Sequence, residues 1–309
     1  RNIFMKTIQV IKILMLSYLS INYMQVVTKA TDLHNQSKTS MITYLYSALW
    51  ESPSSELPLA NKAEKKAIIF DLDGVLCKTN DLQAFYEIGI NTIFSYLVKH
   101  GKPAIKDLFA ALQDTPAIST TDAYNEGLRM PNIMIDWQTG AQSLYDIQDA
   151  MVKQILENKT LTIESKNWLI KTVLMMTTPE KFIATRQIIH AGVDLARELK
   201  KQGYKIYILS NWDPNSFALF QRQFPDLFMM DGQPIFNGIM ISGKVGLAKP
   251  DPAIYTKFLS KFNLTPEDAI FIDDTIENIQ AAQQLGIASI HCQNKNIAQV
   301  RQQLITLLA

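Results

Sequence analysis

Residues 68–76 read IIFDLDGVL, an apolar run that ends by delivering two aspartates, Asp71 and Asp73. The run predicts a strand whose alternation turns Leu72 into the core, and Gly74 lets the backbone turn sharply beyond it. Two carboxylates aimed at one small site repel each other unless a cation or a proton lies between them. The pattern therefore suits a hard divalent metal such as Mg²⁺. It also suits a division into one nucleophilic and one proton-donating carboxylate.

Three later stretches place polar side chains in the same way, at the end of an apolar strand or in the loop beyond it. They are KIYILSNWD (205–213) with Ser210 and Asn211, GLAKPDPAIY (246–255) with Lys249, and AIFIDDTIENI (269–279) with Asp273 and Asp274. Ligands bind at this edge in open α/β sheets. A pair of aspartates alone is a weak signal, but the four groups together predict one site.

These four stretches, in this order, closely resemble the motifs of the haloacid dehalogenase superfamily in its phosphatase-like branch. The resemblance covers Lys66 to about Asn80 and about Ala191 to Gln293. It implies an α/β fold, a doubly wound parallel sheet of the Rossmann type with an inserted all-helical cap. In that sheet the Asp71 strand would be central, between the Ser210 strand and the Asp273 strand.

The resemblance also implies a role for each motif residue in the reaction. Asp71 would be the nucleophile that becomes an aspartyl phosphate, and Asp73 would be the general acid and base. Lys249 would pair with the nucleophile and with the phosphate. These roles agree with the physics of phosphoryl transfer, because a carboxylate that approaches a phosphate dianion is repelled until Mg²⁺ and a lysine neutralise the charge.

Phosphate and metal ligands follow from the same resemblance. The Ser210 side chain and the Asn211 backbone would hold phosphate oxygens together with Lys249. Mg²⁺ would be bound by Asp71, by the backbone carbonyl of Asp73 and by Asp274, with Asp273 either a ligand itself or placed beside one. Asp273 and Asp274 also suit the start of the helix that Thr275 leads, and capping is compatible with metal binding.

The expected function is Mg²⁺-dependent hydrolysis of a small phosphomonoester through an aspartyl-phosphate intermediate. A haloacid-dehalogenase reaction, the cleavage of a carbon–halogen bond, needs the nucleophile Asp71 but no metal, so Asp73 and Asp274 argue against it. A phosphosugar mutase uses nearly the same core, and the sequence does not separate it from a hydrolase. A non-catalytic binding or scaffold protein on this fold is a further alternative, but the motif residues are all intact.

Composition agrees with a folded enzyme of 309 residues, of which 47% are apolar and 19% charged. Lys and Arg number 30 and Asp and Glu 29, a balance that indicates neither a nucleic-acid partner nor an anionic membrane surface. The expected partner is a small phosphorylated metabolite. The two cysteines, Cys77 and Cys292, are too few for a disulfide framework, and we expect Cys77 to be a buried free thiol.

The first 30 residues contain no Asp or Glu, and Lys6 and Lys12 precede an uncharged run over residues 13–28. This pattern resembles a secretory signal or membrane anchor, although an unprocessed amphipathic extension is an equal alternative. The protein would be exported or membrane-associated in the first case and cytoplasmic in the second. Membrane contact is expected only through this segment. The polar residues 31–65 are interpreted as a linker.

Between the first two motifs the chain has helical periodicity and no strand-like alternation, which resembles the family's cap. We expect the cap over residues 81–187 and the catalytic core over residues 66–80 and 188–309. The expected cap helices cover residues 81–100, 103–112, 143–156 and 164–176, with a further helix starting at 178–180. In the core, residues 236–245 with their two glycines predict a β-hairpin. The Trp212 ring is expected either at the mouth of the site or packed against the cap.

Overall fold

The computed structural model describes Leu57 and residues 66–309. The predicted signal or anchor segment over residues 1–30 lies outside the described residues, and so does all of the predicted linker except Leu57. Within the described part, no helix is long and apolar enough to cross a membrane.

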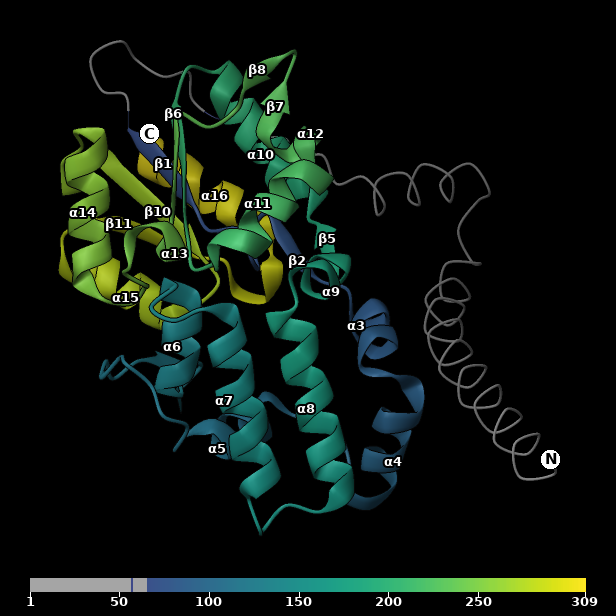
Figure 1. Ribbon diagram of the computed structural model, residues 1–309. Helices are drawn as coiled ribbons and strands as arrows, with labels where there is room; N and C mark the ends of the chain where they lie inside the picture. The colour runs from purple at the N-terminus through teal and green to yellow at the C-terminus, as the bar shows by residue number, and fades with distance from the viewer. Residues whose placement is uncertain (1–56, 58–65) are drawn as a thin grey trace, which may run out of the picture. The chain divides into compact units, whose positions relative to one another are not determined.

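A parallel sheet of five strands lies at the centre of the catalytic core, in the order β11-β10-β1-β6-β9 (Figure 1). The strands are β1 (Ala67–Phe70), β6 (Lys205–Ser210), β9 (Gly238–Ile241), β10 (Ala269–Asp273) and β11 (Ala288–His291). The fold class is therefore confirmed, and β1 lies between β10 and β6 as expected. All four residues of β1 are buried, as a parallel strand covered on both faces requires.

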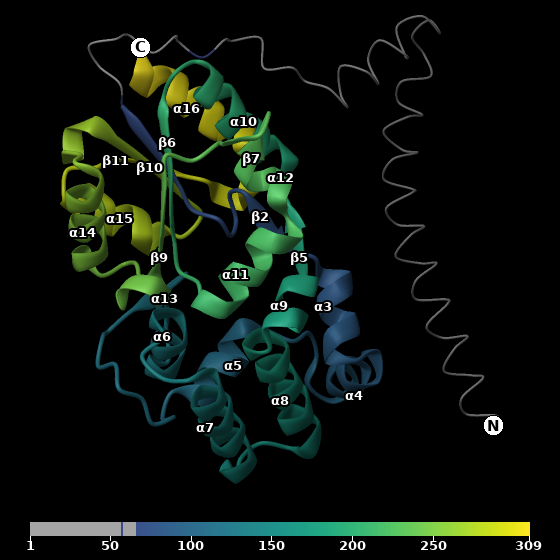
Figure 2. The same ribbon diagram turned by 45° about the horizontal axis from the view of Figure 1, so that its top comes forward.

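Helices cover both faces of the sheet, and strand alternation divides the core between them (Figure 2). Ile68 and Phe70 contribute to the core on one face, whereas Ala67 and Ile69 contribute to the core on the other. The first face carries α10 (His190–Lys201), α11 (Pro214–Gln223), α12 (Pro225–Phe228) and α16 (Ile297–Leu308). The second carries α14 (Pro252–Phe262) and α15 (Ile276–Gln284). Two short 3₁₀ turns, η1 (Pro266–Asp268) and η2 (Gln293–Lys295), complete this part.

The segment between Thr79 and Arg186 forms the cap, which has a hydrophobic core of its own, away from the sheet (Figure 1). Its helices are α3 (Asp81–Ile88), α4 (Ile90–His100), α5 (Ile105–Leu112), α6 (Asn132–Thr139), α7 (Leu144–Glu157), α8 (Ile163–Thr177) and α9 (Pro179–Ala184). The single helix expected over residues 81–100 is wrong, because Gly89 at φ 98° separates α3 from α4.

The cap also departs from the all-helical expectation by one small hairpin. It pairs β3 (Tyr124–Asn125) with β4 (Leu128–Arg129) around Glu126 and Gly127, both of which have positive φ. Strands of two residues are too short to show an alternation of side chains, so this element left no periodic signal in the sequence.

Two antiparallel strands join the cap to the core. The chain leaves the core through β2 (Cys77–Thr79) and returns through β5 (Arg186–Ile188), and the two pair along their full length. The range predicted for the cap, residues 81–187, thus begins at α3 and ends within β5. Both cysteines of the described chain are buried free thiols, as expected.

The β-hairpin expected over residues 236–245 is wrong. Its first half is β9, which pairs parallel with β6 in the main sheet, and its second half is the short helix α13 (Ser242–Val245). The local hairpin is instead β7 (Met229–Met230) with β8 (Gln233–Pro234). Gly243 marks close packing rather than a turn, since a Cβ there would lie 2.8 Å from the carbonyl oxygen of Trp212.

Candidate active site

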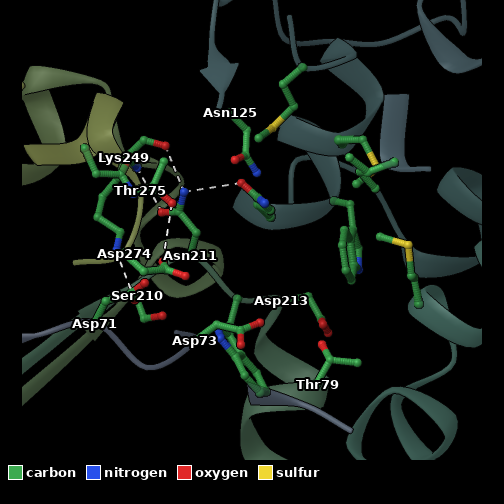
Figure 3. A pocket seen from close by; sticks show the side chains of 18 of the residues that line it. Asp71, Asp73, Thr79, Asn125, Ser210, Asn211, Asp213, Lys249, Asp274 and Thr275 are labelled. Atoms are coloured by element: carbon green, nitrogen blue, oxygen red, sulfur yellow. Dashed lines mark hydrogen bonds and ion pairs between the residues drawn. The ribbon is translucent and has the colours of Figure 1, made fainter. Parts of the chain in front are cut away.

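The carboxyl ends of β1, β6 and β10 bring the predicted motif residues together. Asp71 directly follows β1, and Ser210 and Asp273 are the last residues of the two neighbouring strands. One cavity of about 490 Å³ lies over this edge. It is lined by every predicted site residue except Asp273, namely Asp71, Asp73, Ser210, Asn211, Lys249 and Asp274 (Figure 3).

Lys249 lies beside Asp71, the predicted nucleophile, and only 3% of its surface is exposed. Its Nζ is 2.9 Å from Asp71 Oδ1 and 2.5 Å from Asp273 Oδ2. Burial lowers the pKa of Lys249, but the charges of Asp273 and Asp71 together outweigh burial and place that pKa above its usual value. The amine is therefore held as a cation beside Asp71 at neutral pH.

The Asn211 side chain fixes the loop that carries Lys249. Asn211 Oδ1 accepts from the backbone N–H of Lys249 at 2.9 Å, and Asn211 Nδ2 donates to its carbonyl oxygen at 2.8 Å. Asp251 then caps the following helix α14 by accepting from the N–H of Ala253 at 2.8 Å. The sequence indicated only a backbone role for Asn211, because nothing local reveals a contact between residues 38 positions apart.

Three carboxylates crowd together at this edge. Asp71, Asp273 and Asp274 each offer an oxygen, and these oxygens lie within 4.8 Å of one another. Burial raises the pKa of Asp71 to about 6, although Lys249 acts in the opposite direction. Burial, followed by the charges of Asp273 and Asp71, raises the pKa of Asp274 to about 8. A divalent cation between these oxygens would favour the charged carboxylates, so the donor set fits a hard metal ion.

Asp273 differs from its neighbours because protein donors already engage both of its oxygens. Oδ2 pairs with Lys249, Oδ1 accepts from the N–H of Thr275 at 2.8 Å, and the Asn278 amide lies 3.1 Å from each oxygen. Asp273 is fully buried, whereas Asp274 lines the cavity. Asp273 therefore fixes the Lys249 amine through an ion pair and does not itself line the cavity.

A family model for the haloacid dehalogenase-like hydrolases matches residues 65–286, the span that carries all of the predicted site residues. The chain belongs to this family. It is an enzyme, a hydrolase.

Two curated relatives of this hydrolase are phosphatases. It is 26% identical over 226 residues to a glyceraldehyde 3-phosphate phosphatase of Pyrococcus furiosus, covering 73% of this chain and 79% of that protein. It is also 26% identical over 226 residues to a phosphorylated carbohydrates phosphatase of Thermotoga maritima, covering 73% and 84%. Among solved structures, a HAD family enzyme of Bacteroides thetaiotaomicron superposes with a TM-score of 0.49 at 18% identity, over 74% of this chain and 93% of that one.

Gly74 explains how this haloacid dehalogenase-like hydrolase brings two motifs into contact. Its φ is 78°, and a Cβ on this residue would lie 1.8 Å from Asp274 Oδ2. The sharp turn after β1 therefore leaves room for Asp274, in addition to allowing the unusual backbone conformation.

Arg186 is the site residue that the sequence did not reveal. Its side chain is 4% exposed, donates to Asp73 Oδ2 at 2.7 Å and to Thr79 Oγ1 at 2.8 Å, and lies 4.3 Å from the centroid of the Phe182 ring. Because Arg186 belongs to β5, this ion pair connects the strand that re-enters the core with the second aspartate of the first motif. A lone arginine within IATRQII carries no sequence signal for that contact.

Trp212 packs against the cap, which is one of the two positions that the sequence left open. It lines the cavity, and its buried ring contacts Phe182 of α9 with a centroid distance of 5.3 Å. Gln138 of α6 makes a second contact between the cap and the core of this hydrolase, since it accepts from Asn211 Nδ2 at 3.3 Å and its carbonyl oxygen accepts from Ser242 Oγ at 2.6 Å.

The raised pKa values predict how stability depends on pH. With divalent cations removed by a chelator, Asp274 is protonated in the folded protein up to a pKa of about 8 but ionises near the ordinary aspartate pKa of 3.8 once unfolded. Between these two pKa values the folded state binds one more proton than the unfolded state. The free energy of unfolding is therefore highest at low pH and decreases as the pH rises from the lower pKa to the higher one. Asp274→Asn should remove that loss.

Urea unfolding of the parent and of Asp274→Asn between pH 5 and pH 8 measures this effect. The free energy of unfolding of the parent should fall relative to the variant by about 1 kcal/mol per pH unit. The exposed pair of Asp194 with Arg197 on α10 offers a control, since Asp194→Asn should run parallel to the parent. Parallel curves for the parent and Asp274→Asn would contradict the raised pKa of Asp274.

Proposed function

We propose that this hydrolase is a Mg²⁺-dependent phosphomonoesterase that forms an aspartyl phosphate on Asp71. The observation that carries the proposal is the buried ion pair between Lys249 and Asp71 at the carboxyl edge of the sheet. It places a permanent cation beside a carboxylate at the base of a cavity, which is what the attack on a phosphate dianion requires. The phosphatase names of the two relatives support the same reaction class.

The reaction proceeds in two displacements at phosphorus. In the first, a carboxylate oxygen of Asp71 forms a bond to phosphorus, the bond to the ester oxygen breaks, and Asp73 donates a proton to that oxygen, which leaves as an alcohol. In the second, the Asp73 carboxylate takes a proton from a water molecule that bonds to phosphorus, and the bond to Asp71 breaks. Inorganic phosphate leaves, and both aspartates return to their initial protonation states.

The remaining motif residues stabilise the negative charge of the phosphoryl group. The Ser210 hydroxyl is almost fully buried and lines the cavity together with Asp71, so it would donate to an equatorial oxygen. Lys249 contributes the positive charge, and Asp273 and Asn211 keep it in position. The Asn211 backbone would contribute a further donor.

Asp71, Asp274 and the backbone carbonyl of Asp73 would hold Mg²⁺, and Asp273 would stand behind them. The carboxylates fit this role because their crowding and raised pKa values indicate a place for positive charge. When bound, Mg²⁺ supplies charge neutralisation for the phosphoryl oxygens.

Inorganic phosphate release from a panel of phosphorylated metabolites tests this function. The purified protein should release phosphate with Mg²⁺ present, and a chelator should stop the release. Metal-independent release of halide from a haloacid, with no phosphate release from any ester, would assign the site to carbon–halogen cleavage instead.

The contact between Arg186 and Asp73 leads to a prediction about kcat. Arg186→Met keeps the bulk of the side chain over Phe182 but removes the ion pair that orients Asp73. We expect kcat to fall on the order of tenfold to a hundredfold, as for the loss of a charged hydrogen bond. Arg222→Met on α11, which lies outside the cavity lining, is the matched control and should retain kcat. An unchanged kcat in Arg186→Met would show that Asp73 needs no such support.

A further inference from the structure

The cavity over the carboxyl edge has two chemically different ends. The core end carries the carboxylates, Lys249, Ser210 and Asn211. The opposite wall comes from the cap and is built mainly from apolar and sulfur-containing side chains: Ile105, Phe109, Met130, Met134, Trp137, Met175 and Met176. Figure 3 shows the separation, with sulfur-bearing side chains on the side of the cavity away from Asp71.

Most of this apolar wall is anchored in the hydrophobic core of the cap. Met130, Met134 and Met175 are at most 7% exposed, and Trp137 is 6% exposed. All four belong to the same buried cluster as the packed faces of α7 and α8. The wall therefore presents fixed side chains to a ligand, although methionine can adapt its shape to ligands of different outline.

Part of the hydrogen-bonding capacity on the cap side is already used within the protein. The Thr172 hydroxyl donates to the Trp168 carbonyl oxygen at 2.9 Å within α8, and Gln138 Oε1 accepts from Asn211. Tyr124 and Glu126 lie exposed on the β3–β4 hairpin, and the half-buried Asn125 between them also lines the cavity (Figure 3). Among the described residues that line the cavity on this side, the Trp137 indole Nε1 and the Arg186 Nε are buried donors without a partner, so the wall offers these two donors to ligand acceptors.

The two terminal nitrogens of Arg186 are engaged with Asp73 and Thr79, and only its Nε is left for a ligand. A sugar or polyol on this wall would bury hydroxyl groups against methionines, and each unpaired hydroxyl would lose affinity. An alkyl or aromatic group would instead gain from leaving water.

We propose that the substrate is the phosphate monoester of an alkyl or aromatic alcohol whose few hydrogen-bond acceptors lie near Trp137 and Arg186. The phosphate group lies against Lys249 and Ser210, and the carbon chain or ring of the alcohol lies along the apolar wall from the cap. This inference rests on the proposed phosphomonoesterase function, and it adds the class of the leaving group.

Kinetics on a homologous series test the proposal directly. With Mg²⁺ present, kcat/KM should rise about two- to fourfold per methylene from methyl through butyl to hexyl phosphate. Hexyl phosphate should exceed a hexose phosphate by about a hundredfold, since the two have similar size but most of the sugar hydroxyls would lie against apolar side chains. A flat series, or a preference for the hexose phosphate, would overturn the proposal.

A pair of variants on one helix locates the effect. Met176→Gln places an amide on the wall, whereas Ile163→Gln changes a residue of α8 that is 73% exposed and outside the cavity lining. Met176→Gln should lower kcat/KM for hexyl phosphate about tenfold and leave methyl phosphate unchanged. Ile163→Gln should change neither. Equal losses on both esters in Met176→Gln, or no loss on hexyl phosphate, would contradict the wall as the binding surface.

Binding of alkyl phosphonates separates the two proposals, because their carbon–phosphorus bond is not hydrolysed. Calorimetry with the parent protein and Mg²⁺ should show affinity that increases with chain length, whether or not the protein turns over any ester. Chain-length-dependent binding without phosphate release from any ester would overturn the phosphomonoesterase function and leave the apolar site standing. Phosphate release without chain-length-dependent binding would overturn the apolar site alone.

Discussion

Asp71→Asn is expected to abolish turnover while the fold stays intact. The amide is nearly isosteric with the carboxylate but is a poor nucleophile, so the first displacement at phosphorus is lost. Removing a group that acts in covalent catalysis costs on the order of 10⁴ or more in kcat. Steady-state release of inorganic phosphate, with enough enzyme to detect a residual rate, measures the loss.

The controls for this variant address folding and surface charge. Lys249 keeps its contact with Asp273 when Asp71 is neutral, so we expect the melting temperature to stay close to that of the parent. Asp194→Asn on α10 removes an exposed carboxylate and should retain full activity. Activity of Asp71→Asn within about tenfold of the parent would rule out Asp71 as the nucleophile, because a factor of ten is only ~1.4 kcal/mol of barrier.

The second large effect concerns the metal. A chelator should reduce phosphate release to background, and Mg²⁺ should restore it. Asp274→Asn should raise the Mg²⁺ concentration needed for half-maximal rate by at least about a hundredfold, in line with the loss of a charged ligand. Titration of the rate with Mg²⁺ measures the shift for each variant.

Asp251→Asn is the matched control for Asp274→Asn. Asp251 also starts a helix near the site, and its carboxylate caps α14, but it lies outside the buried carboxylate cluster. Asparagine is itself a good capping residue, so this variant should keep both its stability and its Mg²⁺ requirement. Equal Mg²⁺ requirements in the two variants, or full activity with chelator, would refute the assignment of Asp274 as a metal ligand.

The sequence was sufficient to predict the sheet and the residues at its edge. A buried parallel strand is a continuous apolar run, and polar groups placed directly after such runs must gather where the strands end. This local rule located Asp71, Ser210 and Asp274 without knowledge of any long-range contact. The order β10-β1-β6 came from the family resemblance, and the structure confirmed it.

Predictions failed where the deciding contact lies far along the chain. Residues 236–245 suggested a hairpin because two glycines flank a short apolar run, but pairing with β6 makes the first half a strand of the main sheet. Gly89 divides the helix expected over residues 81–100, although the apolar periodicity continues across it. Periodicity reports which face is buried and does not report where the axis bends.

Local patterning by itself indicated apolar strands that end in polar groups, because strands and their ends are encoded within a few residues, and the family resemblance of those motifs implied the parallel α/β sheet. Tertiary structure alone decided what surrounds the candidate active site. Arg186 meets Asp73 across 113 positions of sequence, and Asn211 holds the Lys249 loop across 38. The apolar wall of the cavity depends on which faces of α5, α6 and α8 point toward the core. The sequence does not distinguish an apolar residue that faces a neighbouring helix from one that faces a ligand cavity.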